Sequence, residues 1–220
     1  MIIEKARYWA ENMTELSKND RLWLNNPVIM QGVGLAPMVV AATSGYTALV
    51  LAVAVAVMLT PTRVAGAVLR KALGEQYDRF AVLCYALPAA LCYIAAYFLV
   101  RHLWGPSALQ QVGVYLPLLV FEPLIIRRYR AAVPEGPVRA LRRGLYTTVG
   151  YLVVLLGVGL ARELLAQGSL MGVQLLEVQL FPLAAQPAGG FMLLGAVCAA
   201  WRGRVRAFKR NIYQEVERNK

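Results

Sequence analysis

The sequence predicts an all-α polytopic membrane protein with six transmembrane helices in two inverted three-helix repeats, in which the first and fourth spans are broken. Three observations lead to this prediction. Of the 220 residues, 59% are hydrophobic and 16% are charged, whereas charged residues make up about 25% of an ordinary soluble domain. Apolar stretches recur along the chain, and the basic residues fall between them in a regular pattern.

The apolar stretches define the expected spans, since a helix needs roughly 20 apolar residues to cross a bilayer. The candidate spans lie at about residues 27–43, 45–60, 80–100, 108–126, 145–165 and 182–201. The membrane domain would then cover residues 27–202, with repeats at about 23–101 and 108–202.

The basic residues indicate how the chain is oriented. The formal net charge is +11, and 21 of the 23 Lys and Arg residues lie in segments 1–26, 61–79, 127–143 and 202–220. With six spans these segments all fall on one side, so the positive-inside rule predicts a multi-pass protein of the cell inner membrane with cytoplasmic N- and C-termini. The charge is then an orientation signal and a contact for the lipid bilayer, and we expect no nucleic-acid partner.

The segments outside the spans have simple expected roles. Residues 1–26 should form a cytoplasmic amphipathic segment that lies along the membrane. After a span that ends at Thr60, residues 61–79 should form an interfacial helix capped by Gly74. We expect turns at 105–107 and 131–143, an outer surface segment at 171–181, and a basic cytoplasmic tail at 203–220.

The first and fourth spans contain residues that interrupt helices. Glycine tolerates backbone conformations that other residues avoid, and proline removes a backbone donor, so both predict a break whose carbonyls need other partners. Paired broken segments are typical of inverted-repeat membrane proteins, where they line a site; a tight packing kink explains the first break equally well. The broken-helix positions are Gly32, Gly34, Ala36, Pro37, Pro117 and Pro123.

Glu122 is a carboxylate inside the apolar run of the fourth span. Such a charge costs several kcal/mol unless it is paired, hydrated or protonated. Two interpretations stay open: Glu122 pairs with Arg127 or Arg128 near the membrane boundary, or it lies on an ion, proton or subunit-contact path.

Arg162 and Glu163 form a second candidate site near the end of the fifth span. Because adjacent residues on a helix do not face each other, each side chain should find a different partner. We therefore expect an inter-helix or inter-subunit anchor, or part of an ion pathway, on the outer side.

The sequence contains no arrangement of residues that indicates self-contained catalysis. The only histidine, His102, lies at a predicted span end and is expected at the surface. Cys84, Cys92 and Cys198 lie inside predicted spans without a Cys-x-x-Cys motif, so we expect neither a metal site nor a disulfide. We expect at most a non-catalytic subunit of a larger enzyme.

Five motifs follow one another along the chain. They are Leu22-Trp-Leu-Asn-Asn-Pro27 with Gln31, Gly34-Leu-Ala-Pro37, Gly113-Val-Tyr-Leu-Pro-Leu-Leu-Val120, Ala161-Arg-Glu-Leu-Leu-Ala-Gln-Gly-Ser-Leu170 and Pro187-Ala-Gly-Gly-Phe191. In this order they resemble the RnfE/NqrD subunit family. The resemblance implies six spans in two inverted repeats and membership of an Rnf/Nqr-type complex that couples electron transfer to sodium or proton translocation. It also implies other membrane subunits as partners, especially an RnfA/NqrE-like paralogue.

The sequence departs from that family at two positions. The resemblance implies a cysteine before the proline of the first broken span and another in the fourth, which together with the partner subunit hold an iron–sulfur cluster. Here the corresponding residues are Ala36 and Phe121-Glu122-Pro123. Because neither alanine nor proline can ligate iron, we expect this chain to bind no cluster and to act as a scaffold or ion-pathway subunit. The alternative is an inverted-repeat small-molecule transporter no longer tied to electron transfer.

Overall fold

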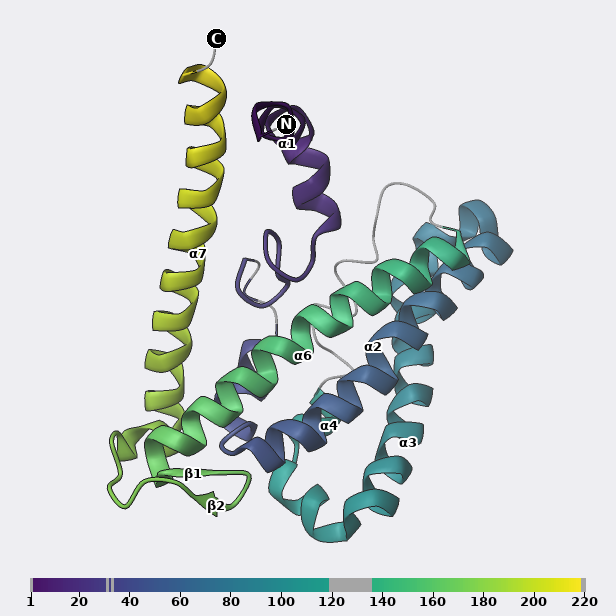
Figure 1. Cartoon of the computed structure of the whole chain (residues 1–220). Coiled ribbons are helices and arrows are strands. Elements are labelled where there is room, and N and C mark those ends of the chain that lie inside the picture. The colour runs from purple at the N-terminus through teal and green to yellow at the C-terminus, as the bar shows by residue number, and fades with distance from the viewer. Residues whose placement is uncertain (1, 31, 33, 119–135, 219–220) are drawn as a thin grey trace.

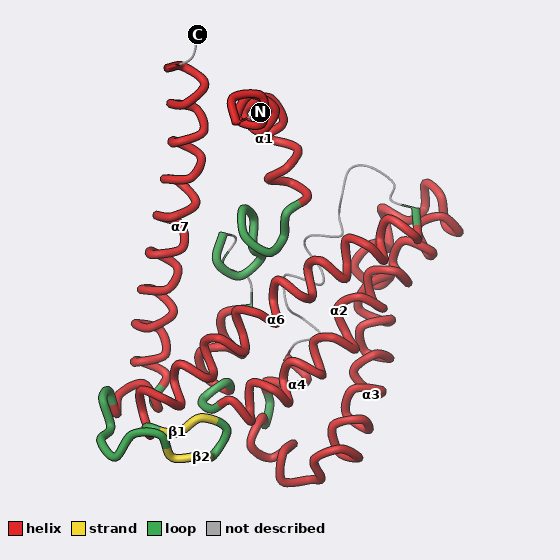
Figure 2. The backbone as a smooth tube through the Cα atoms, viewed as in Figure 1, coloured by secondary structure: helices red, strands yellow, loops and turns green. Residues whose placement is uncertain are grey.

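The computed structural model describes residues 2–30, 32, 34–118 and 136–218. Three helices form the core: α2 (Gly45–Leu73), α3 (Tyr77–Val112) and α6 (Pro137–Gln167). The central helix is α2, which packs against both α3 and α6, while α7 (Pro187–Arg218) and α1 (Ile2–Asn19) lie to one side (Figure 1). Figure 2 shows that helix dominates and that the one hairpin is small.

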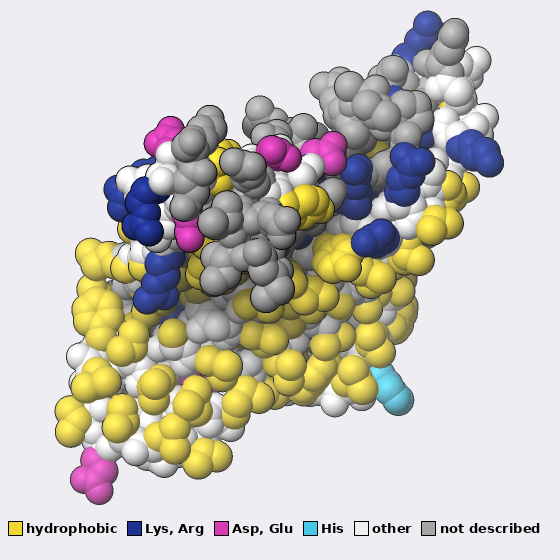
Figure 3. Space-filling view, turned by 45° about the horizontal axis from the view of Figure 1, so that its top comes forward, with side chains coloured by type: hydrophobic (Ala, Val, Ile, Leu, Met, Phe, Trp, Pro, Cys, Tyr) yellow, Lys and Arg dark blue, Asp and Glu magenta, His cyan; other side chains and the backbone are white. Residues whose placement is uncertain are grey.

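Within the described residues, α2, α3 and α6 are the three helices long and apolar enough to cross a membrane. They contain the spans expected at 45–60, 80–100 and 145–165. The prediction of a helical, multi-pass membrane protein is therefore confirmed. Figure 3 shows the matching surface: apolar side chains cover a broad area, and Lys and Arg side chains gather beyond one border of it.

Helix α2 is longer than the sequence predicts. It begins with a capping box, in which Ser44 Oγ accepts a hydrogen bond from the Thr47 N–H at 3.2 Å and Thr47 Oγ1 accepts one from the Ser44 N–H at 3.0 Å. The prediction that the span ends at Thr60 and that a separate interfacial helix follows is wrong, because α2 continues through Pro61, although the helix does end at the predicted cap, Gly74. Proline removes only one backbone donor, and the neighbouring Thr60 hydroxyl is hydrogen-bonded to the Thr148 hydroxyl of α6 at 2.8 Å.

Helices α3 and α6 also extend beyond the expected spans. The turn predicted at 105–107 is a kink inside α3, where Gly105 has φ 77° and Pro106 continues the helix. The turn predicted at 131–143 is partly wrong, since α6 already begins at Pro137. Proline fits the first position of a helix because its φ angle is preset and its missing donor is not needed there.

Residues 27–43 form no long helix, in agreement with the predicted break. Gly32 and Gly34 have φ angles of 64° and 75°, and the chain becomes helical again in η1, a single π-helical turn at Pro37–Ala41. The segment before the glycines consists of turns rather than a half-helix. This irregular segment, residues 26–44, is called the broken segment below.

After α3, the short helix α4 (Tyr115–Leu118) contains Pro117 and packs beside η1. After α6, a small hairpin of β1 (Ser169–Leu170) and β2 (Val173–Gln174) precedes the 3-10 turn η4 (Pro182–Ala185). The sequence predicts a sixth span from Pro182, but the long helix begins at Pro187 and runs past residue 202 without a break. The basic tail is thus a continuation of α7, and α1 packs against that part through an edge contact of Trp9 with Phe208.

Candidate functional site

The most extensive polar site among the described residues surrounds Arg162 on α6. Its side chain is 0% exposed. The Nη1 atom donates hydrogen bonds to three carbonyl oxygens of the broken segment, those of Met38 at 3.2 Å, Val39 at 2.6 Å and Ala42 at 3.0 Å. Met38 and Val39 lie within the π-helical turn η1, and Ala42 directly follows it.

The same guanidinium group also binds the segment that precedes α7. Its Nε atom donates to the Ala184 carbonyl at 2.9 Å, and Nη2 donates to the carbonyls of Ala185 and Gln186 at 3.4 and 3.3 Å. Arginine is suited to this position because its planar group carries five N–H donors in a fixed arrangement. Arg162 therefore holds both the broken segment and the segment before α7. The backbone carbonyls of such irregular segments need hydrogen-bond partners at membrane depth.

Glu163 binds a different set of groups. Its Oε2 atom accepts a hydrogen bond from the Gly45 N–H at 2.7 Å, at the first residue of α2. Its Oε1 atom accepts hydrogen bonds from Ser169 Oγ at 3.1 Å and from the Gly172 N–H at 2.9 Å in the hairpin. Glu163 is 3% exposed. Its carboxylate accepts a hydrogen bond from an N–H group at the N-terminus of α2, where a negative charge is stabilising.

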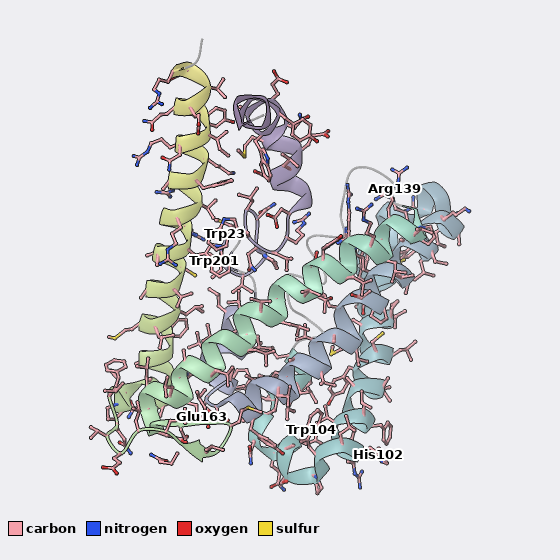
Figure 4. All side chains as sticks on the ribbon, viewed as in Figure 1. Trp23, His102, Trp104, Arg139, Glu163 and Trp201 are labelled. Atoms are coloured by element: carbon pink, nitrogen blue, oxygen red, sulfur yellow. The ribbon has the colours of Figure 1, made fainter. Side chains whose placement is uncertain are left out.

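The pair thus holds four parts of the chain at the C-terminal end of α6: the broken segment, the start of α2, the hairpin and the segment before α7. As expected for adjacent residues, Arg162 and Glu163 bind different partners, and Figure 4 shows Glu163 where α6 approaches the hairpin. The partners named above all belong to this chain. Roles of Arg162 and Glu163 in an ion pathway or in a subunit contact stay predictions.

Asn26 fixes the beginning of the broken segment. Its Oδ1 atom accepts hydrogen bonds from the Val28 and Ile29 N–H groups at 3.0 and 3.3 Å, and its Nδ2 atom donates to the Gly150 carbonyl of α6 at 2.8 Å. Asn26 is not among the site residues predicted from the sequence. The available signal was its position before Pro27, since Asn-Pro favours the start of a turn.

Helix α7 supplies two further contacts to the beginning of this region. Arg202 Nε donates to the Ile29 carbonyl at 2.8 Å, and Trp201 Nε1 donates to the Trp23 carbonyl at 3.1 Å. The two tryptophan rings lie 4.8 Å apart (Figure 4). Neither role is predicted from the sequence, because Trp201 and Arg202 look like the ordinary end of an apolar run.

Gly34 is required by both space and backbone conformation. Gly34 is buried and has φ 75°, a backbone conformation that favours glycine. A Cβ atom at this position would overlap atoms of the Tyr151 ring. The Tyr151 hydroxyl also donates to the Gly34 carbonyl at 3.3 Å. Of the other predicted break positions in this segment, Pro37 is buried at the start of η1 and Ala36 is exposed.

The structure brings part of the second break to the first, because α4 with Pro117 packs beside η1. Glu122 and Pro123 lie outside the described residues. The functional hypothesis for Glu122 therefore stays a prediction.

Among the described residues, the position at the first break that would supply a cluster ligand is occupied by Ala36. Ala36 offers only a methyl group, and the cysteines lie on other helices, with Cys84 and Cys92 on α3 and Cys198 on α7. In the described part of the chain, no three His, Cys, Asp or Glu side chains are close enough to hold a metal ion. His102 is exposed near the end of α3, as expected for a surface residue (Figure 4).

The sequence of this chain is similar to those of known membrane proteins. The model of a family described as "Rnf-Nqr subunit, membrane protein" matches residues 16–198, which include the broken segment, the Arg162–Glu163 pair and most of every core helix. The chain belongs to this family. The resemblance found in the motifs is therefore confirmed.

Three relatives illustrate the similarity, and each carries the name of the ion-translocating oxidoreductase complex subunit designated E. The relative from Pseudomonas paraeruginosa is 33% identical over 209 residues, covering 86% of this chain and 84% of the relative. The relative from Pseudoalteromonas atlantica is 29% identical, covering 81% and 82%. The relative from Buchnera aphidicola is 24% identical, covering 90% and 93%.

Proposed function

We propose that this chain is an integral membrane subunit of an Rnf/Nqr-type complex that couples electron transfer to sodium or proton translocation. The observation that carries this proposal is the match, over more than four fifths of both chains, to relatives that are subunits of ion-translocating oxidoreductase complexes. Within such a complex the chain would act as a scaffold or ion-pathway subunit. The buried clamp of Arg162 and Glu163 supports a scaffold role, because it holds an irregular segment in one fixed conformation.

The proposed topology is six crossings in two inverted repeats, with both termini on the cytoplasmic side of the inner membrane. The course of the chain supports it: the broken segment joins the end of α1 to the start of α2 at the opposite end of the molecule (Figure 1). Helices α2, α3, α6 and α7 then run between the same two ends, and both termini lie at one end. The Lys and Arg side chains gather near that end (Figure 3), as the positive-inside rule requires for the cytoplasmic side.

The proposal includes no iron–sulfur cluster held by the broken segments of this chain. Ala36 cannot supply a ligand, and iron–sulfur clusters normally draw on four thiolates. An RnfA/NqrE-like paralogue, which we propose as the neighbouring subunit, would then have to hold any cluster without help from Ala36 or Pro123. An electron that crosses at this depth would otherwise use another carrier.

Purification of the tagged chain from its native membrane tests the proposal. We expect other membrane subunits of the complex to co-purify, and we expect inverted membrane vesicles to accumulate sodium ions or protons when an electron donor is added. A low-temperature electron paramagnetic resonance signal that disappears only when residues of this chain change would contradict the proposal on the cluster. Recovery of the chain alone, with donor-independent uptake of a small molecule, would contradict membership of the complex and favour a transporter.

Glu122 provides a separate test of an ion-pathway role. Glu122→Gln removes the charge with little change in volume, so a role in ion movement should be lost while assembly is kept. We expect normal co-purification and at least a tenfold slower ion uptake per electron transferred. Uptake equal to that of the wild-type complex would exclude Glu122 from the pathway.

A further inference from the structure

A basic pocket lies at the N-terminal end of α6, at the opposite end of that helix from Arg162. Its cavity volume is about 470 Å³, and its basic lining residues are Arg21, Arg139, Arg142 and Arg143. Arg21 belongs to the turn after α1, whereas the other three arginines lie on the first two turns of α6. We propose that this pocket binds the phosphate headgroup of an anionic phospholipid.

The charge balance of the pocket favours an anion. Among the described residues, four arginines and one carboxylate, that of Asp20, line it. Asp20 already accepts hydrogen bonds from the backbone N–H groups of Leu22 at 2.9 Å, Trp23 at 3.0 Å and Leu24 at 3.3 Å. The Asp20 carboxylate offsets one of these positive charges, so the described lining residues keep an excess of positive charge. Clustered arginines match phosphate oxygens in charge and in hydrogen-bond geometry.

The surface next to the pocket favours a lipid over free phosphate. Tyr146 lines the pocket, and Val149 and Val153 follow it on the same face of α6 at spacings of three and four residues. Their side chains are 46% and 50% exposed. An apolar strip that begins at a phosphate-sized basic pocket fits a molecule with a charged head and an acyl chain. Free phosphate would gain nothing from the strip.

The position of the pocket agrees with a headgroup site. Arg139 lies at the far end of α6 from Glu163 (Figure 4), and Lys and Arg side chains in that region border the apolar surface (Figure 3). Basic pockets between helices at the cytoplasmic face are known to suit anionic headgroups. Lipid binding at this pocket does not depend on the proposed electron-transport function.

Binding of phosphatidylglycerol to the purified full-length chain, measured by native mass spectrometry, tests the proposal. The pocket variant is Arg139→Gln combined with Arg142→Gln. The matched control is Arg206→Gln combined with Arg210→Gln, which removes the same charge from exposed positions on α7. We expect the pocket variant to weaken phosphatidylglycerol binding about 30-fold and the control to weaken it less than about threefold. Inorganic phosphate at millimolar concentration should not displace the lipid, and phosphatidylcholine should bind equally to all three proteins.

Two further variants keep the test decisive. Arg139→Lys with Arg142→Lys preserves the charge and should retain most of the binding, which excludes misfolding as the cause of the loss. Val149→Ser with Val153→Ser should weaken the lipid several-fold. Equal weakening by the pocket and control variants would overturn the proposal, as would displacement by phosphate. Unchanged lipid binding with loss of co-purifying subunits would also overturn it, because the pocket would then hold an acidic partner surface.

Discussion

At its C-terminal end α6 carries Arg162, whose side chain is fully buried, whereas at its N-terminal end it carries Arg139, Arg142 and Arg143, which are all exposed. The five N–H groups of the buried arginine contact six acceptors, one Nη1 hydrogen being shared between two of them, and all six are backbone carbonyls of irregular segments. The exposed arginines surround a pocket open to a ligand. One residue type on one helix can therefore either replace missing backbone donors or bind an external anion, depending on what surrounds it.

The largest effect is expected at the buried end. Arg162→Met would leave the carbonyls of Val39, Ala42 and Ala184 without their donor. Since each buried unsatisfied polar group costs about 1–3 kcal/mol, we expect a loss of at least about 4 kcal/mol. This corresponds to a decrease in the melting temperature of about 10 °C, measured in detergent by circular dichroism.

The matched control is Arg139→Met, which should change the melting temperature by less than about 2 °C. Arg162→Lys should give an intermediate value, because lysine has three donors and no planar fork. Equal melting temperatures for Arg162→Met and Arg139→Met would show that the clamp does not stabilise the broken segment.

The next effect concerns Glu163, the acidic member of the clamp. Glu163→Gln keeps the shape but replaces one acceptor oxygen by an NH₂ group, which cannot accept the hydrogen bonds from Gly45 or from Ser169 and Gly172. We expect amide hydrogen exchange to become about tenfold faster at whichever of Gly45 and Gly172 faces the new NH₂ group, corresponding to about 1.4 kcal/mol of lost local protection. Glu177→Gln, at an exposed position outside the helices, is the control and should leave both rates unchanged.

A third effect concerns the backbone that the clamp holds. Gly34→Ala places a methyl group against the Tyr151 ring at a residue with φ 75°, and the left-handed conformation alone costs alanine about 1 kcal/mol. We expect the melting temperature to decrease by about 5 °C. Gly157→Ala, a helical position of α6 with open space around it, should have no effect or a slight stabilising effect. A neutral Gly34→Ala variant would mean that the segment adapts and is not rigidly held.

The sequence predicted the break and the unusual charges because both signals are local. Glycines and a proline inside an apolar run indicate irregular backbone wherever they fold, and Arg162 with Glu163 stands out in an apolar helix. The continuation of α2 through Pro61 was not predictable in this way. The local cost of the proline is fixed by its chemistry, whereas the packing of α2 against α6, which includes the Thr60–Thr148 hydrogen bond, joins positions 88 residues apart.

The identity of the partners that hold the broken segment was equally inaccessible. Asn26 reaches the Gly150 carbonyl across 124 residues, and Arg202 reaches the Ile29 carbonyl across 173 residues. Nothing near either residue in sequence indicates which backbone group it will bind. The pocket at the beginning of α6 was missed for a related reason, since Arg21 meets the arginines of α6 only in the folded chain.

The smallest effect on stability is expected at the exposed end of α6. The Arg142 guanidinium carbon lies 5.9 Å from the centre of the Tyr146 ring, a cation–π geometry that contributes little at an exposed site. Arg142→Gln should therefore shift the melting temperature by less than about 2 °C in a phosphatidylcholine detergent mixture. Addition of phosphatidylglycerol should raise the melting temperature of the wild-type chain, because a ligand that binds only the folded state stabilises it, and it should raise that of Arg142→Gln less. Arg162→Lys should keep the full lipid-dependent increase from its lower starting value, since Arg162 lies at the other end of the helix. If instead both variants lost the increase, the two ends of α6 would be coupled through the helix, and the division between a structural and a binding end would be incorrect.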